Sequence, residues 1–95
     1  MYILRIEHPV SEYAVWKKTF DSDPIGRERS GVRRYRIACA ADDPNLVMID
    51  LEFDSTAEAE AVHDKLLEVW SRVEAEGLIR QPQARVVEVV ETEEY

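Results

Sequence analysis

The sequence has one cysteine, three glycines and no long apolar run. A single cysteine, Cys39, cannot form a disulfide within the chain, which fits a reducing compartment. No segment approaches the roughly 20 consecutive apolar residues of a membrane-spanning helix. The first residues also lack the basic-then-apolar arrangement of a signal peptide, because Arg5 and Glu7 interrupt the apolar positions. We therefore expect a cytoplasmic protein with no membrane partner.

Positive charge is scarce too, with 12 Lys and Arg residues against 20 Asp and Glu residues. Residues 1–45 hold 8 basic and 7 acidic side chains, whereas residues 46–95 hold 4 and 13. An acidic protein repels phosphate backbones, so we expect no nucleic acid partner. The aromatic Lys/Arg-Gly-Phe strand motif of RNA-binding domains is missing as well, since residues 46–53 read LVMIDLEF.

The centre of the chain predicts a strand followed by a long helix. Apolar side chains alternate with others over residues 47–53, which is typical of a half-buried strand. Over residues 59–73 the apolar side chains instead recur with the 3.6-residue period of a helix. Ser55 and Glu58 fit a capping box at the helix start, and Gly77 fits a helix stop.

Three more strands and one more helix are expected around this unit. The extra helix follows Ser11, its expected N-cap, and a loop with Pro and Gly follows over residues 21–30. Turn-forming residues at 41–45 join two neighbouring strands into an antiparallel hairpin. Val32 breaks the alternation of its strand, which indicates a bulge near Arg33. The additional strands are expected at residues 2–8, 31–39 and 84–90.

The resulting order, βαββαβ, predicts a ferredoxin-like α+β sandwich. We expect one domain over residues 1–95, built on a four-stranded antiparallel sheet in the order 4-1-3-2 with both helices on one face. Two helices leave the other face open. A solvated face would explain its charges, but a subunit interface better explains why valines of residues 84–90 fall on both faces. We therefore predict a homodimer formed through the open face, whose expected side chains are Ile3, Arg5, Glu7, Arg34, Arg36, Met48, Asp50 and Glu52.

Residues along the whole chain resemble one superfamily. They are Trp16, Phe20, Gly31-Val32, Asp43-Pro44, Phe53-Asp54, Ala59 and Gly77. In this order they are similar to the dimeric α/β-barrel superfamily, which includes antibiotic-biosynthesis-monooxygenase-like proteins. The resemblance implies that two sheets face each other in a dimeric barrel and that a small ligand lies between sheet and helices. Its members include cofactor-independent oxygenases, haem degraders, isomerases and proteins without known activity, so the resemblance supports the fold more than an activity.

We expect no cofactor and no metal. One cysteine and two distant histidines, His8 and His63, give no metal-ligand spacing, and for His8 a structural role at the strand end is favoured. Haem degraders of the superfamily use an Asn and a Trp followed by a His. Here Asn45 is the only asparagine and lies in an expected turn, and His63 precedes Trp70.

Aromatic side chains on the two helices suggest where a ligand would bind. Tyr13, Trp16 and Phe20 form a stripe at helical spacing, which is typical of either a core or a pocket wall. On the other helix, His63 shares a flank with Trp70, seven residues later. We therefore consider a pocket in which His63 is the general base and Tyr35 hydrogen-bonds the substrate as the second catalytic residue. Its ligand-binding side chains would be Trp16, Trp70 and Tyr13. The alternative is that the stripe is core and His63 lies at the helix edge.

Five arginines crowd a short segment: Arg27, Arg29, Arg33, Arg34 and Arg36. They could recognise a carboxylate or phosphate, or pair with the acidic second half. Two function classes remain open. One is a cofactor-independent, monooxygenase-like enzyme acting on a small aromatic or apolar molecule, and the other is a non-catalytic ligand-binding or assembly module. A cavity of a few hundred Å³ would favour a ligand site.

Overall fold

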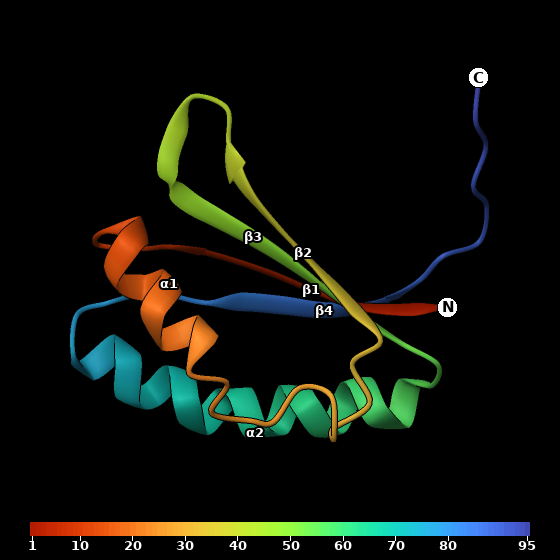
Figure 1. Cartoon of the computed structure of the whole chain (residues 1–95), viewed down its shortest axis with the longest axis horizontal. Coiled ribbons are helices and arrows are strands. Elements are labelled where there is room, and N and C mark those ends of the chain that lie inside the picture. The colour runs from red at the N-terminus through yellow and green to blue at the C-terminus, as the bar shows by residue number, and fades with distance from the viewer.

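Six elements make up the computed structural model, which describes all 95 residues. The four strands form one antiparallel sheet in the order β2-β3-β1-β4, and both helices lie on the same side of it (Figure 1). This confirms the predicted ferredoxin-like α+β fold and strand order. No helix is long and apolar enough to cross a membrane. The elements are β1 (Tyr2–Pro9), α1 (Tyr13–Asp21), β2 (Arg34–Ala40), β3 (Asp43–Phe53), α2 (Thr56–Ala75) and β4 (Gln83–Glu88).

The register of the two central strands decides which side chains face the helices. Alternation along β1 and β3 places four cross-strand pairs on the covered face, and in three of these pairs both side chains are buried. Apolar side chains of α1 and α2 pack onto this face and complete a core cluster of 14 buried residues. The three pairs are Leu4 with Leu51, Ile6 with Ile49, and His8 with Val47.

The ends of α2 follow the predicted signals. The Ser55 hydroxyl accepts a hydrogen bond from the Glu58 backbone N–H (3.2 Å) and donates one to the Glu58 carboxylate (3.0 Å). At the other end Gly77 has φ +80°. Its N–H donates to the Glu74 carbonyl and the Leu78 N–H donates to the Val73 carbonyl, each at 3.0 Å, which is a Schellman motif. The expected helix is therefore confirmed at both termini.

The start of α1 differs from the prediction. Ser11 is not the N-cap; that position is Glu12, and its side chain makes no capping hydrogen bond. The reason is tertiary, because Val10 forms a bridge with Ile79 and the Ser11 N–H donates to the Leu78 carbonyl (3.0 Å). Ser11 is thus held against the connection between α2 and β4, outside the helix.

The hairpin of β2 and β3 also corrects two expectations. The turn is only Ala41 and Asp42, because β3 begins at Asp43. Pro44 is tolerated there because pairing of β3 with β1 begins only at Leu46. No bulge lies near Arg33, since β2 starts after it; the irregular register lies between Cys39 and Ala40.

The open face of the sheet carries the eight side chains predicted for it. Ion pairs cross its strands, with 3.1 Å between Arg5 Nε and Asp50 Oδ1 and 2.9 Å between Arg34 Nε and Glu52 Oε2. In β4, Val87 pairs with Ile3 on this face, whereas neighbouring Val86 points toward the helices. β4 ends at Glu88, two residues before the predicted end, and the chain then leaves the sheet (Figure 1).

Candidate functional site

A cavity of about 60 Å³ lies between the two helices and the covered face of the sheet. Most of the side chains that line it are apolar, 11 of 15. α1 contributes Trp16 and Phe20, and α2 contributes Trp70, so both tryptophans of the chain face this space. A water molecule takes about 30 Å³ of liquid, and a cavity of about 150 Å³ holds benzene. The cavity therefore has room for about two waters, and it falls short of the few hundred Å³ expected of a ligand site.

His8 is the titratable group of β1 that lines the cavity. Its side chain is 2% exposed, and its ring lies 5.7 Å from the Trp16 ring in an edge-to-face contact. Nδ1 lies 3.3 Å from the Pro9 carbonyl oxygen. Since a carbonyl can only accept, Nδ1 carries the proton and Nε2 keeps a lone pair.

The second ring nitrogen of His8, Nε2, has no hydrogen-bond partner in the structure. Every side-chain nitrogen or oxygen that is fully shielded from solvent has a hydrogen-bond partner. Because Nε2 makes no hydrogen bond, it is not fully shielded. Burial lowers the pKa of His8, and it outweighs the opposing effect of the Pro9 carbonyl. The site therefore presents a neutral imidazole with one unprotonated nitrogen, which can accept a hydrogen bond or a proton.

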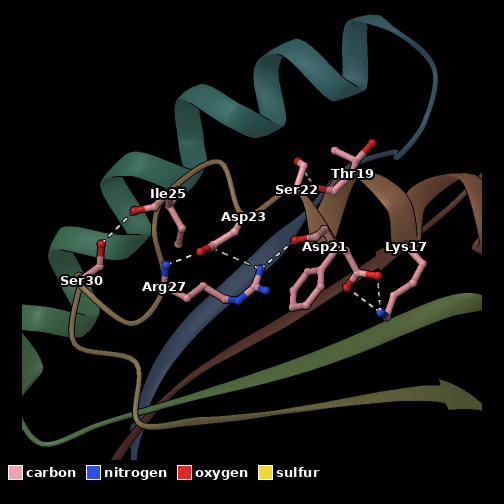
Figure 2. Close-up of polar contacts among 9 residues, drawn as sticks. Lys17, Thr19, Asp21, Ser22, Asp23, Ile25, Arg27 and Ser30 are labelled. Atoms are coloured by element: carbon pink, nitrogen blue, oxygen red, sulfur yellow. Dashed lines mark hydrogen bonds and ion pairs between the residues drawn. The ribbon is translucent and has the colours of Figure 1, made fainter.

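Arg27 closes the cavity on the side of the loop between α1 and β2. Its side chain is only 16% exposed, and Nη1 donates to the Phe20 carbonyl oxygen (2.8 Å). The guanidinium carbon lies 4.0 Å from the centre of the Phe20 ring and 5.0 Å from that of Tyr35, which are cation–π distances. Asp23 orders the loop by accepting from the Arg27 backbone N–H (2.9 Å), as Figure 2 shows.

The predicted site residues divide between the cavity and its surroundings. Trp16 and Trp70 line the cavity as expected. Tyr13 does not; it packs against Trp16 with 5.7 Å between ring centres. Tyr35 and His63 are not among the residues that line the cavity.

Tyr35 and His63 lie outside the cavity because of their positions on β2 and α2. Tyr35 belongs to the edge strand β2, is 43% exposed, and contacts the Phe20 ring (5.1 Å between centres). His63 precedes Trp70 by two helical turns, about 10 Å along the axis, and contacts that ring from a half-buried position (6.0 Å between centres). A catalytic role for the pair stays a prediction from the sequence, and the cavity instead presents His8.

The arginine-rich segment is partly structural. Arg33 pairs with Asp54 (2.7 Å) and Arg34 with Glu52 (2.9 Å), as expected if these arginines neutralise the acidic second half. Arg29 and Arg36 form no ion pair in the structure. Nowhere do three or more His, Cys, Asp or Glu side chains gather in a way that could hold a metal ion.

Sequence reasoning missed His8 and Arg27 as residues of the cavity. A signal for His8 was present, because it follows Tyr2, Leu4 and Ile6 at the two-residue period of the covered face. Arg27 gave no comparable signal, because its position depends on a loop with three residues at positive φ, Asp23, Gly26 and Gly31.

The fold recurs in solved structures of low sequence identity. A candidate antibiotic biosynthesis monooxygenase from Deinococcus radiodurans has a TM-score of 0.70 at 12% identity, over 100% of this chain and 98% of that protein. A dimeric ferredoxin-like protein from an uncultured marine organism has a TM-score of 0.67 at 11% identity, over 100% of both chains. A candidate antibiotic biosynthesis monooxygenase from Nitrosomonas europaea has a TM-score of 0.61 at 16% identity, over 96% of this chain and 100% of that protein. No protein-family model and no curated protein matches the sequence. The predicted resemblance is thus confirmed at the level of the fold.

Proposed function

We propose that this protein is a homodimeric, monooxygenase-like enzyme that binds a small, largely apolar molecule at the cavity beside His8. The observation that carries the proposal is a buried imidazole with a lowered pKa and no hydrogen bond at Nε2, on a residue that lines an apolar space walled by two tryptophans. An apolar pocket with a few convergent polar groups is the usual form of a small-molecule site. The shared fold with two candidate antibiotic biosynthesis monooxygenases supports the reaction class.

His8 would supply the proton-transfer step of such a reaction. Nε2 takes a proton from an acidic C–H of the substrate, and the resulting carbanion reduces dioxygen. A CH₂ group loses both hydrogens and becomes a carbonyl; one oxygen atom stays in the product and the other leaves as water. The substrate supplies all the electrons, so the reaction needs no added reductant. The apolar walls keep His8 neutral and therefore able to accept the proton at neutral pH.

The dimer would form through the open face of the sheet. Ile3 and Val87 are an apolar cross-strand pair on this face, and the similar marine protein is described as dimeric. The ion pairs of Arg5 with Asp50 and of Arg34 with Glu52 neutralise charges that such an interface would cover. Two sheets packed face to face would leave both cavities, one per subunit, on the outer sides.

The size of the cavity favours a second function, a non-catalytic ligand-binding or assembly module. Because the cavity has a volume of only about 60 Å³, a ligand ring must displace side chains in order to enter. Loop residues Pro24 and Ile25 line both the cavity and a surface hollow beside α2, so they offer the most direct path for such a displacement.

Tryptophan fluorescence distinguishes these functions, because both tryptophans line the cavity. We expect small phenols to change the emission of the native protein and of Val15→Phe, a surface control. Val73→Phe fills the cavity and should abolish the change. Dioxygen uptake with C–H-acidic aromatic ketones should then fall by about 10²–10⁴ in His8→Asn. Binding without dioxygen uptake would support the non-catalytic function, and no binding at all would contradict both.

A further inference from the structure

We infer that Arg27 is an anion anchor at the mouth of the cavity, and that the ligand is a small carboxylic acid with an apolar body. The inference rests on the proposed function, because it names the ligand class of the same site. Arg27 belongs to the arginine-rich segment, but unlike its neighbours in that segment it lines the central cavity.

The position of Arg27 joins two spaces. It lines the apolar cavity on one side and, on the other, a surface hollow of about 430 Å³ whose wall includes Tyr35. It is the residue that both spaces share. A ligand held at Arg27 can therefore keep a charged group in the wetter hollow and direct an apolar group toward His8.

The hydrogen bonds of Arg27 leave one edge of its guanidinium free. Nη1 donates to the Phe20 carbonyl, but Nε and Nη2 make no hydrogen bond. The parallel N–H groups of Nε and Nη2 match the two oxygens of a carboxylate. The ring centres of Phe20 and Tyr35 lie 4.0 and 5.0 Å from the guanidinium carbon, and these contacts and the bond to the Phe20 carbonyl restrict its movement, so little side-chain freedom is lost on binding.

The nearby acidic groups leave the charge of Arg27 only weakly paired. Both oxygens of Asp21 accept from Lys17 Nζ, at 2.6 and 2.7 Å, so Asp21 is engaged (Figure 2). Asp23 is the one ion-pair partner of Arg27, through a single 3.5 Å contact to Nη1, and its side chain is 38% exposed. Glu28 also lines the hollow but forms no ion pair with Arg27.

The other cations of the hollow are already neutralised. Arg33 and Arg34 each lie within 3 Å of a carboxylate, that of Asp54 and that of Glu52 respectively. The hollow therefore offers one under-paired, partly desolvated guanidinium next to an apolar cavity. This arrangement selects an organic acid over a neutral molecule of the same shape, because only the acid supplies a second charge-assisted pair of hydrogen bonds.

Matched pairs of acids and amides test the anchor. The dissociation constants of acetate and acetamide, of butyrate and butyramide, and of benzoate and benzamide are measured by NMR titration. We expect the native protein to bind the larger acids at least about tenfold more tightly than their amides. Arg27→Gln should reduce this preference to less than about twofold, whereas the control Arg29→Gln, in the same loop, should keep it.

Each alternative outcome has a separate meaning. A preference that survives in Arg27→Gln, or amides that bind the native protein as tightly as acids, would overturn the anchor and leave the proposed function intact. If no compound of either kind binds, the proposed function fails as well. If Arg27→Gln is unfolded at the temperature of the titration, Arg27→Lys is used in its place. Lysine keeps the charge but lacks the paired N–H edge, so an undiminished preference in that variant would also overturn the anchor.

Discussion

His8 combines burial with a carbonyl partner, and both features have consequences at the scale of one residue. Burial lowers its pKa below the ordinary value of about 6.5, so the folded state binds fewer protons than the unfolded state as the pH falls. The stability that His8 contributes is therefore fully present above about pH 6.5. It is lost as the pH falls from 6.5 toward the lower pKa of the folded state.

This linkage predicts how the free energy of unfolding depends on pH. Denaturant unfolding at several values between pH 7.5 and 5 should show a decline for the native protein that is reduced in His8→Asn, whose amide can still donate to the Pro9 carbonyl. His63→Asn, which changes a half-buried histidine outside the cavity, serves as the control and should keep the native decline. An identical decline in His8→Asn would show that His8 remains free to ionise in the folded protein.

The placements of single residues that could be predicted from the sequence were those that follow from the regular spacing of strands and helices. The two-residue period of β1 places His8 with Leu4 and Ile6, so its burial could be predicted. The helical period correctly placed Trp16 and Trp70 around one space. The same period could not show that His63, two turns from Trp70, lies outside the cavity lining, because that depends on how far the core extends along α2.

At the scale of elements, all three glycines have positive φ, and Gly31 and Gly77 differ in their surroundings. Gly31 has φ +100°, and a Cβ there would collide with the Glu58 carboxylate of the α2 capping box. Gly77 has φ +80° and open space around it. Gly31→Ala should therefore lower the free energy of unfolding by about 2–3 kcal/mol and Gly77→Ala by about 1 kcal/mol. Chemical denaturation of both variants checks the order, and a larger loss at Gly77 would refute it.

The capping box itself gives a further prediction. Ser55→Ala removes the acceptor for the Glu58 N–H at the start of α2 and should destabilise the protein by about 1 kcal/mol. Ser71→Ala, an exposed position in the interior of the same helix, is the matched control. It should be neutral or slightly stabilising because alanine has the higher helix propensity. Equal losses in the two variants would mean that the cap contributes nothing specific.

Elements with local start and stop signals were predicted well, and elements defined by distant contacts were not. Ser55 and Gly77 act within a few residues of themselves, so the ends of α2 could be predicted from sequence. Ser11 has the right chemistry for an N-cap, but its backbone is held by the Leu78 carbonyl, 67 positions further along the chain. No local pattern reveals that contact, and the same limit applies to the loop that places Arg27.

At the scale of the whole molecule, the open face should control assembly. Light scattering at micromolar concentration should give a dimer for the native protein. Val87→Asp places a charge on the open face and should give a monomer, because an unpaired charge is costly to bury. Leu67→Asp changes an exposed apolar residue of α2 and should leave the dimer intact. A monomeric native protein, or a dimer that Val87→Asp does not weaken, would contradict the proposed interface.

The architecture of the whole molecule could be predicted because the separate sequence signals agreed with one another. Strand alternation, helix caps and short connections all indicated the same βαββαβ order, and the register then placed all eight expected side chains on the open face. The size of the cavity could not be predicted. Side chains that fill a core and side chains that line a pocket are of the same types, and only their three-dimensional packing distinguishes them.

Nitrogen NMR of the His8 imidazole at neutral pH tests the central claim, that a neutral base faces the cavity. The structure predicts a proton on Nδ1, no proton on Nε2, and an Nε2 resonance that moves when phenol is added to the native protein but not to Val73→Phe. A proton on Nε2, or a doubly protonated ring at pH 7, would contradict the account, because no free nitrogen would then face the ligand.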